Sequence, residues 1–194
     1  IFIFIMEILT GNIRQIIVHT SADFRADEML AHMAATRPPD TYNINKNNTE
    51  VSMITVSLCM IVKNEAAILA RCLSAIAPAV DEIIIADTGS AARTKAVARK
   101  FTSHIFDFPW NDNFSDARNF SFSKASMQYC MWLDADDVIT PDNLKKLQDL
   151  KRTLPPRTDI VMLQYATGFD SGQSPSFFYY RERLIRRQGA FLWQ

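Results

Sequence analysis

Three carboxylates lie within four residues directly after an apolar segment. The run reads Met131-Trp-Leu-Asp134-Ala-Asp136-Asp137-Val-Ile139. The apolar part predicts a buried strand, so the acids follow its carboxyl end, where open α/β sheets bind ligands. Carboxylates this close repel one another unless a cation or a hydrogen-bonding ligand offsets the charge. Because magnesium is usually held by one or two carboxylates and substrate phosphates, the run predicts a metal and diphosphate site.

Three further polar segments stand where predicted strands end or predicted helices begin. They are Lys63-Asn64-Glu65, Asp87-Thr88-Gly89-Ser90 and Ser115-Asp-Ala-Arg118-Asn119. Parallel strands bring the first two to the same edge as the acid run. Asp87 and Asn119 can meet the edge of a nucleobase, and Arg118 can grip a diphosphate in two places. Gly89 allows a close approach of the backbone, so the set matches the needs of a nucleotide-sugar donor.

The elements that must position these residues alternate between strand and helix from Val51 onward. This alternation predicts an α/β sheet with crossover helices. Strands are predicted over 54–62, 82–86, 104–108, 128–133 and 159–165, and helices over 65–76, 93–101, 115–127 and 142–150. Ser115 and Thr140 are the predicted N-caps of the last two helices. A hairpin is predicted from 177–180 and 183–186, with Arg181, Arg183, Arg186 and Arg187 on a solvated face.

Residues 1–50 differ from the rest of the chain. They contain a predicted helix over 26–36 and end in an Asn-rich linker over 43–49. We therefore expect an N-terminal extension of uncertain order over 1–50 and a nucleotide-binding domain over 51–194.

Composition excludes several classes of protein. Lys and Arg total 21, as do Asp and Glu, so no net field favours nucleic acid. No apolar stretch approaches the ~20 residues of a transmembrane segment. Three cysteines without metal-ligand spacing fit a reducing compartment. We expect a cytoplasmic protein, and a peripheral association with a membrane stays open.

Four motifs, in order and at natural spacing, resemble the inverting glycosyltransferase family 2. They are Ser57-Leu-Cys-Met-Ile-Val-Lys-Asn-Glu65, Asp81-Glu-Ile-Ile-Ile-Ala-Asp-Thr-Gly-Ser90, Trp110-Asn-Asp-Asn-Phe-Ser-Asp-Ala-Arg-Asn119 and Trp132-Leu-Asp-Ala-Asp-Asp137. The resemblance covers about residues 54–194. It is to the branch that occurs with tetratricopeptide repeats or in lipopolysaccharide-core glucosyltransferases. Tyr179-Tyr-Arg-Glu-Arg183 also fits the repeat-bearing bacterial members.

The resemblance implies a GT-A fold, a nucleotide-diphosphate sugar donor with a UDP-sugar favoured, and Mg²⁺ or Mn²⁺. It implies that Asp87 contacts the nucleoside, that Arg118 and Asn119 contact the nucleotide, and that Asp136 binds the metal. Asp134 would reach the ribose or the metal, and Asp137 could share the metal. The implied nucleotide-sugar site comprises Val62, Asn64, Glu65, Asp87, Gly89, Arg118, Asn119, Asp134, Ala135 and Asp136, with the metal on Asp136 and Asp134. The implied reaction is a single inverting displacement at the anomeric carbon, with the metal neutralising the leaving diphosphate.

The chain departs from the family pattern in two places. Ala91 and Ala92 stand where the family usually has Thr-Asp, which predicts a weaker cap for the helix that follows. The chain ends at Phe191-Leu-Trp-Gln194, where such relatives continue. We therefore expect a C-terminally truncated domain whose general base lies beyond Gln194. Asp170 and Glu182 are the nearby alternatives for that base.

Other interpretations stay open at this point. The acid run could be a solvated turn, Asp87 could merely cap a helix, and Arg118 could pair with Asp112 or Asp116 on the surface. The chain could bind a donor without turnover because the acceptor half is missing. A haloacid-dehalogenase-type phosphohydrolase also carries Asp-x-Asp after a strand, but on its first strand. The acceptor could be a glycan, a lipid-linked molecule or a protein.

Overall fold

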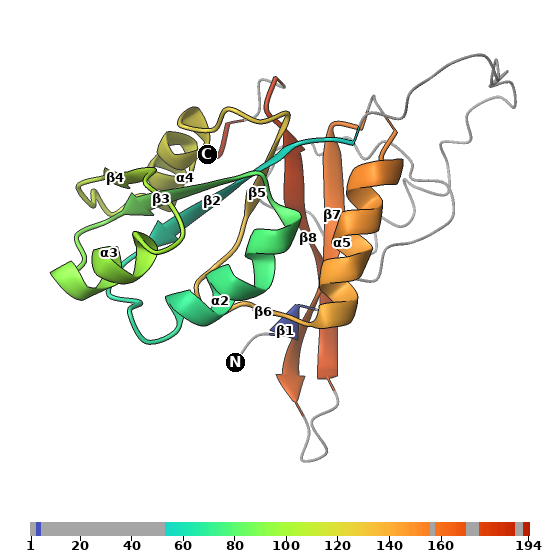
Figure 1. The fold of residues 1–194 in the computed structure, drawn as a ribbon, viewed down its shortest axis with the longest axis horizontal. Helices are drawn as coiled ribbons and strands as arrows, with labels where there is room; N and C mark the ends of the chain where they lie inside the picture. Colours follow the sequence, from blue (N-terminus) through green and yellow to red (C-terminus); the bar gives the residue numbers. More distant parts are fainter. Residues whose placement is uncertain (1–2, 5–52, 156–157, 170–174, 189–191) are drawn as a thin grey trace, which may run out of the picture.

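The structure is a computed structural model that describes residues 3–4, 53–155, 158–169, 175–188 and 192–194. These residues form a mixed eight-stranded sheet in the order β4-β3-β2-β5-β8-β7-β1-β6 (Figure 1). The strands are β1 (Ile3–Phe4), β2 (Val56–Val62), β3 (Glu82–Asp87), β4 (Ile105–Asp107), β5 (Tyr129–Trp132), β6 (Val138–Ile139), β7 (Ile160–Phe169) and β8 (Pro175–Arg186). The helices are α2 (Leu69–Ile76), the 3₁₀-helix η1 (Ala77–Ala79), α3 (Ala92–Ala98), α4 (Phe114–Ser123) and α5 (Pro141–Thr153). The predicted α/β class is confirmed, whereas the predicted helix over 26–36 and linker over 43–49 lie outside the described residues.

Strands β4, β3, β2 and β5 run parallel, and their register brings their carboxyl ends to one edge. Val62 at the end of β2 pairs with Asp87 at the end of β3, and Asp87 pairs with Asp107 of β4. On the other side of β2, Cys59 pairs with Trp132 at the end of β5. The turns after β2, β3 and β5 therefore share one edge, as the sequence predicts.

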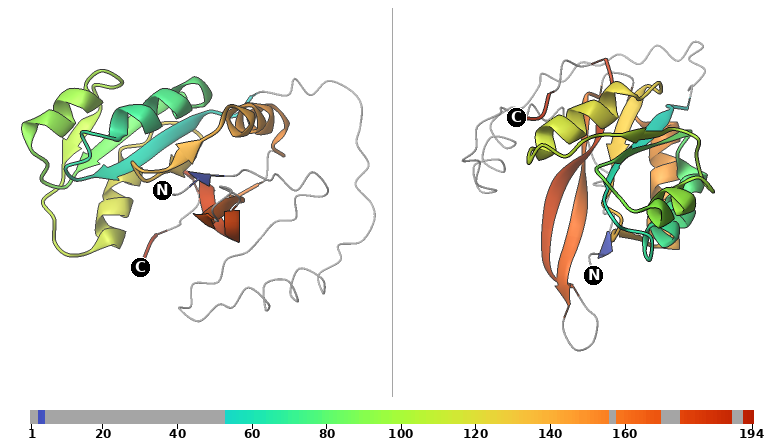
Figure 2. Two further views of the ribbon diagram at one scale, coloured as in Figure 1. Left: turned by 90° about the horizontal axis from the view of Figure 1, so that it is seen from below. Right: turned by 90° about the vertical axis from the view of Figure 1, so that its left-hand side faces the viewer.

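Helices cover both faces of this parallel half (Figures 1 and 2). Helices α2 and α5 bury their apolar sides on one face, against residues such as Leu58 and Met60. Helix α4 covers the opposite face, where Phe122 packs on a smaller cluster that includes Cys59 and Cys130. Because β2 and β5 are buried on both sides, they are apolar runs without alternation. Among the described residues, the helices are all too short or too polar to span a bilayer.

Strands β7 and β8 form a long antiparallel hairpin that projects beyond the parallel half (Figure 2). Strand β8 lies between β7 and β5, with Leu184 opposite Met131. The predicted hairpin within 177–186 is wrong, because both of its supposed arms lie in β8. The segment between them is Arg181-Glu182, which lacks the Gly, Pro, Asn or Asp that a tight turn needs.

The capping of two helices agrees with the pattern expected from the sequence. Ala91 precedes α3 in an extended conformation and makes no side-chain cap, which confirms the weaker capping that Ala91 and Ala92 predict. Helix α3 also ends at Ala98 instead of 101. Thr140 caps α5 as predicted, because its hydroxyl accepts a hydrogen bond from the Asn143 N–H at 3.3 Å.

The predicted N-cap of α4 is wrong by two residues. Asn113 is the cap: its Oδ1 accepts from the N–H groups of Ser115 at 2.9 Å and Asp116 at 3.3 Å. Asn and Ser are equally good caps, so sequence alone does not separate Asn113 from Ser115. The loop places Asn113 in an extended conformation, which a cap residue requires, and Ser115 is already helical.

The Asn113 cap can be tested against the cap that the sequence predicted. We expect Asn113→Ala to lower the free energy of unfolding by about 1 kcal/mol, because two N–H groups lose their acceptor. Ser115→Ala should change it by less than about 0.5 kcal/mol. Urea denaturation followed by circular dichroism measures both, and a larger loss for Ser115→Ala would contradict the assignment.

Candidate functional site

The turns after β2 and β3 are locked together by Asn64. Its backbone has a positive φ of 60°, a conformation that Asn tolerates better than most residues. The Asn64 N–H donates to Ser90 Oγ at 2.9 Å, and Asn64 Oδ1 accepts from the Ala91 N–H at 2.9 Å. Beneath them, the carbonyl of the buried Val62 accepts from the Thr88 N–H at 3.0 Å. The described contacts of Asn64 therefore shape the edge of the site.

Glu65 and Gly89 complete these two turns. The Glu65 carbonyl accepts from the N–H groups of Ile68 at 3.1 Å and Leu69 at 3.0 Å, and so forms the turn that precedes α2. Helix α2 consequently begins at Leu69 instead of 65. Gly89 has φ +101°, which explains the glycine at this position.

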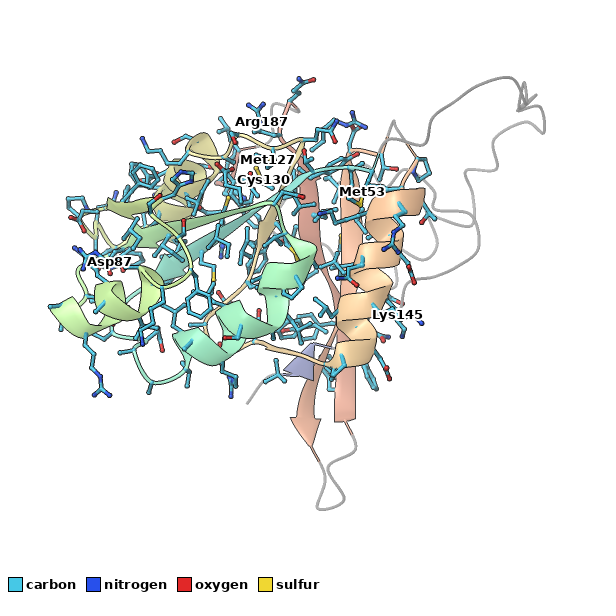
Figure 3. All side chains as sticks on the ribbon, in the orientation of Figure 1. Met53, Asp87, Met127, Cys130, Lys145 and Arg187 are labelled. Atoms are coloured by element: carbon cyan, nitrogen blue, oxygen red, sulfur yellow. The ribbon has the colours of Figure 1, made fainter. Side chains whose placement is uncertain are left out.

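Asp87 is 1% exposed and uses only one of its two carboxylate oxygens. Oδ1 accepts from the N–H groups of Gly89 at 3.0 Å and Ser90 at 2.8 Å, whereas Oδ2 is buried without a hydrogen-bond partner. A buried acceptor without a donor costs about 1–3 kcal/mol. Figure 3 shows Asp87 at the edge of the parallel strands, at the opposite end from Met127 and Arg187. A ligand that donates a hydrogen bond to Oδ2 would offset the cost.

The acid run forms a turn between β5 and β6, which we call the acid turn (residues 134–137). Its ends are joined by two hydrogen bonds: the Asp137 N–H donates to the Asp134 carbonyl at 3.1 Å, and the Asp134 N–H donates to Asp137 Oδ2 at 3.0 Å. The Asp134 side chain is 53% exposed and Asp136 is half-buried, while Ala135 is buried. The turn therefore leaves the carboxylates of Asp134 and Asp136 accessible to a ligand.

Helix α2 holds the acid turn from the other side. Arg71 Nη2 donates to the Asp136 carbonyl at 2.9 Å, and Cys72 Sγ donates to the Asp134 carbonyl at 3.6 Å. Burial raises the pKa of Cys72 to about 12, so its thiol stays protonated and can donate. These bonds use backbone carbonyls and leave both accessible carboxylates available.

Asp137 has a different role from its two neighbours. It is fully buried, and its Oδ2 lies 3.4 Å from Arg183 Nη1. Burial raises the pKa of Asp137 to about 6, and the Arg183 charge opposes that rise. Asp137 pairs with Arg183 inside the protein and is therefore less suited to a metal than the two accessible carboxylates, and its predicted share in the metal stays a prediction.

Arg118 of α4 lies next to the acid turn. Its Nη2 is 4.0 Å from Asp134 Oδ1, and its Cζ is 4.1 Å from the centroid of the Trp132 ring. Its Nη1 is buried without a hydrogen-bond partner. Burial lowers the pKa of Arg118 to about 10, so the guanidinium is still charged at neutral pH. A charged group with an unused N–H fits an anion that approaches the acid turn.

The alternative surface pairing of Arg118 is wrong. Asp112 Oδ1 accepts from Trp110 Nε1 at 2.8 Å, and Asp116 Oδ2 accepts from Asn111 Nδ2 at 2.6 Å. Asp112 therefore bonds within the loop before α4, Asp116 in the first turn of α4 bonds back to that loop, and Arg118 faces the sheet instead.

Asn119 is bound to the end of the chain. Its Nδ2 donates to the Trp193 carbonyl at 2.9 Å, and its Oδ1 accepts from the Trp193 N–H at 2.9 Å. The Trp193 ring in turn lies edge-on to Trp132, with centroids 5.7 Å apart. The Asn119 amide therefore holds Trp193 beside Arg118, and its predicted contact with a nucleotide stays a prediction.

Arg183 is the residue that sequence reasoning missed. Between Val161 and Met162 the register with β8 shifts, because Val161 pairs with Leu184 and Met162 with Glu182. Arg183 is the extra residue of this β-bulge, and bulges re-aim side chains. Arg183 is 1% exposed and lies 3.7 Å from the centroid of Trp132, so its predicted solvated position is wrong. The adjacent apolar pair Leu184-Ile185, which breaks the alternation, is the one sequence signal that pointed to it.

The described residues include no group of three His, Cys, Asp or Glu side chains placed to hold a metal by themselves. A cation bound here would therefore take one or two carboxylates and complete its shell with ligand oxygens, as Mg²⁺ commonly does. Of the two alternatives for a general base, Asp170 lies outside the described residues. Glu182 is half-buried, and its backbone carbonyl accepts from Trp132 Nε1 at 2.6 Å.

Comparison with curated proteins finds bacterial relatives of part of the chain. It is 44% identical over 88 residues to a TPR repeat-containing protein of Synechococcus elongatus, which is 45% of this chain and 22% of that protein. It is 31% identical over 97 residues to an uncharacterized glycosyltransferase of Rickettsia felis, 50% of this chain and 32% of that protein. It is 28% identical over 108 residues to the glycosyltransferase SunS of Bacillus subtilis, 52% of this chain and 24% of that protein. The matches thus span between about a fifth and a third of each relative's length.

Among solved structures, glucosyl-3-phosphoglycerate synthase from Mycobacterium tuberculosis in complex with UDP matches with a TM-score of 0.40 and 24% sequence identity. The match covers 45% of this chain and 35% of that one. The family model for glycosyl transferase family 2 matches residues 57–190, which include all four motifs and the acid turn. The chain belongs to glycosyl transferase family 2, and its α/β sheet with flanking helices is the GT-A architecture expected of it.

Proposed function

We propose that this chain is the donor-binding part of a glycosyltransferase that uses a nucleotide-diphosphate sugar and a divalent cation. One observation carries the proposal: a buried, charged Arg118 with an unused N–H lies 4.0 Å from Asp134 at the edge where Asp87 keeps an unused oxygen. These groups complement the parts of one ligand. The diphosphate is an anion, and a nucleobase carries N–H groups.

Asp87 is suited to hold the nucleobase. Its Oδ2 can accept an N–H from the base, and its Oδ1 stays fixed by the turn at Gly89 and Ser90. Uracil has an N–H on its pairing edge, which favours a UDP-sugar. The walls of this part of the site would be the turns that carry Val62, Asn64, Glu65 and Gly89.

Arg118 and the acid turn are suited to hold the diphosphate. Mg²⁺ or Mn²⁺ on Asp136 and Asp134 would neutralise charge on the leaving diphosphate. Arg118 would donate its free Nη1 N–H to a phosphate oxygen while staying 4.0 Å from Asp134. Ala135, which is buried, separates Asp134 from Asp136 along the acid turn. The displacement would be single and inverting, with a carboxylate as the general base that takes the acceptor's proton.

A second candidate function is donor binding without turnover. It stays a candidate because Asp137 is buried against Arg183 and Glu182 is half-buried, so neither is an exposed base beside the acid turn. The acceptor of the transfer would be a glycan, a lipid-linked molecule or a protein. A phosphohydrolase is not favoured, because the acid turn follows β5 and not the first strand of the parallel half.

The proposal is tested by thermal denaturation with UDP, GDP, CDP, ADP and their sugars, each with and without Mn²⁺. A ligand that binds the folded protein raises its melting temperature by mass action. We expect the largest shift from UDP or a UDP-sugar with Mn²⁺. Turnover of a radiolabelled UDP-sugar then separates the two candidate functions. No shift with any nucleotide would reject both.

Asp87→Asn tests the assignment of the base. The amide keeps an oxygen for Gly89 and Ser90 and replaces the unused Oδ2 by a donor, so the fold should be kept. We expect UDP affinity to fall by about 1–3 kcal/mol, roughly 5- to 150-fold, because the base N–H loses its acceptor. Asp107→Asn is the matched control, since Asp107 pairs with Asp87 in the sheet but is 75% exposed and bound to Lys95. Isothermal titration with UDP and Mn²⁺ measures both, and equal losses would contradict the assignment.

A further inference from the structure

Arg183 contacts both parts of the proposed donor site from within the protein. Its Nη1 donates to the Trp132 carbonyl at 3.1 Å, and its guanidinium lies against the Trp132 ring, where Arg118 also lies. The same Nη1 is 3.4 Å from Asp137 Oδ2. Arg183 therefore contacts Trp132, against which Arg118 also packs, and Asp137, the buried carboxylate of the acid turn.

The contact with Asp137 continues to the backbone of the acid turn. Asp137 Oδ2, which pairs with Arg183, also accepts the Asp134 N–H at 3.0 Å. Fixing this oxygen fixes the amide of Asp134, and with it the direction in which the Asp134 carboxylate leaves the turn. The second bond of the turn, from the Asp137 N–H to the Asp134 carbonyl, keeps the two residues in register.

Burying an arginine at this position costs free energy of folding. This cost argues that the arrangement around Arg183 has a function. Arg183 is 1% exposed, its Nε is buried without a hydrogen-bond partner, and burial lowers its pKa. The Arg118 charge beside it adds repulsion. A planar guanidinium can stack on an indole and bridge a carboxylate and a carbonyl at once, which the ammonium of lysine cannot do.

We propose that Arg183 is a positioning residue that sets the Arg118 guanidinium and the acid turn in one geometry for the diphosphate and its cation. This inference rests on the proposed function. Arg183 acts through Trp132 and Asp137 and does not itself touch the ligand. The β-bulge is the device that turns it inward, and its pairing with Asp137 leaves Arg118, with its unused Nη1 N–H, to meet a diphosphate.

Hydrogen exchange of the protein without ligand tests the positioning directly. In Arg183→Met we expect the amides of Asp134 and Asp137 to exchange at least about tenfold faster than in the unmodified chain, because the oxygen that holds the turn loses its partner. Arg183→Lys should restore part of the protection, since it keeps the charge but not the stack. Arg186→Met is the matched control.

Arg186 serves as this control because it also lies beside an aromatic ring and a carboxylate, although its side chain is 27% exposed. It lies in the same strand, its Cζ is 5.4 Å from the centroid of the Tyr129 ring, and its Nε is 3.2 Å from Asp159 Oδ1. It pairs with Tyr129 at the opposite end of β5 from the acid turn. A general loss of stability should therefore appear in both variants, and faster exchange at the acid turn only in Arg183→Met.

Titration with UDP and Mn²⁺ supplies the second readout. We expect Arg183→Met to weaken Mn²⁺-dependent UDP binding by about 10- to 100-fold, the usual effect of removing a group that orients metal ligands. Arg186→Met should change it less than about twofold. Equal effects of both variants, or unchanged exchange at Asp134 in Arg183→Met, overturn the positioning role. If the unmodified chain does not bind UDP, the proposed function fails, and the inference fails with it even where exchange responds.

Discussion

Asp136→Ala is expected to abolish the Mn²⁺-dependent stabilisation of the protein by UDP. A ligand at 100 times its dissociation constant stabilises by about 2.7 kcal/mol. For a chain of this size that corresponds to a rise of roughly 5–10 °C in melting temperature. The contact of Asp136 that holds the acid turn among the described residues is through its backbone carbonyl, which Arg71 binds at 2.9 Å. The substitution therefore removes the metal ligand and leaves the turn in place, so the shift should vanish without a large change in the free protein.

Asp142→Ala is the matched control for this measurement. Asp142 is an exposed acid in the first turn of α5, six positions after Asp136, and has no place in the proposed site. Its loss should leave the ligand-induced shift unchanged. A full shift in Asp136→Ala would reject the assignment of the metal to this side chain, and a lost shift in both variants would point to a non-specific effect of removing acidic charge.

Asp137→Ala is expected to destabilise the protein more than any other single change in the acid turn. It leaves the Arg183 guanidinium, which is 1% exposed, without its carboxylate, and it removes the acceptor of the Asp134 N–H. Breaking one partner of a buried ion pair typically costs about 3–5 kcal/mol. Urea denaturation measures the loss as a lower midpoint at unchanged slope.

A double variant separates the cost of the unpaired charge from the loss of packing. Asp137→Ala with Arg183→Met removes both charges, and it should recover most of the lost stability, because replacing a whole buried pair by apolar groups is often neutral. A loss below about 1 kcal/mol in Asp137→Ala alone would mean that water reaches Arg183. Recovery of stability without recovery of UDP binding would agree with the positioning role of Arg183.

The sequence predicts those parts of the site that depend on one strand and its following turn. Asp87 and the acid turn follow uninterrupted apolar strands, and parallel pairing alone places them at a common edge. Neither position needs knowledge of distant residues. The same holds for the cap of α5, where Thr140 and Pro141 form a local signal.

The parts that sequence does not predict depend on partners far along the chain. The turn of Asn64 is shaped by Ser90, Arg118 is set by Trp132, and Asn119 is held by Trp193. Strict alternation predicts Arg183 on a solvated face, but a single extra residue in β8 reverses the side of the sheet on which a side chain emerges. Such a bulge follows from the pairing of β8 with β7, which local patterns do not contain.

The insertion of β8 between β5 and β7 has a consequence for the order of assembly during synthesis. Trp132 and Arg183 are separated by 51 positions, yet they are in contact. Closing a long loop between such partners is slow compared with forming local helices. On the ribosome, β2, β3 and β5 can pair as soon as they emerge, whereas the edge of β5 stays open until β8 has been translated. Nascent chains halted before that strand should therefore expose the unpaired backbone N–H and C=O groups along the edge of β5. They should also fail to bind the proposed UDP ligand.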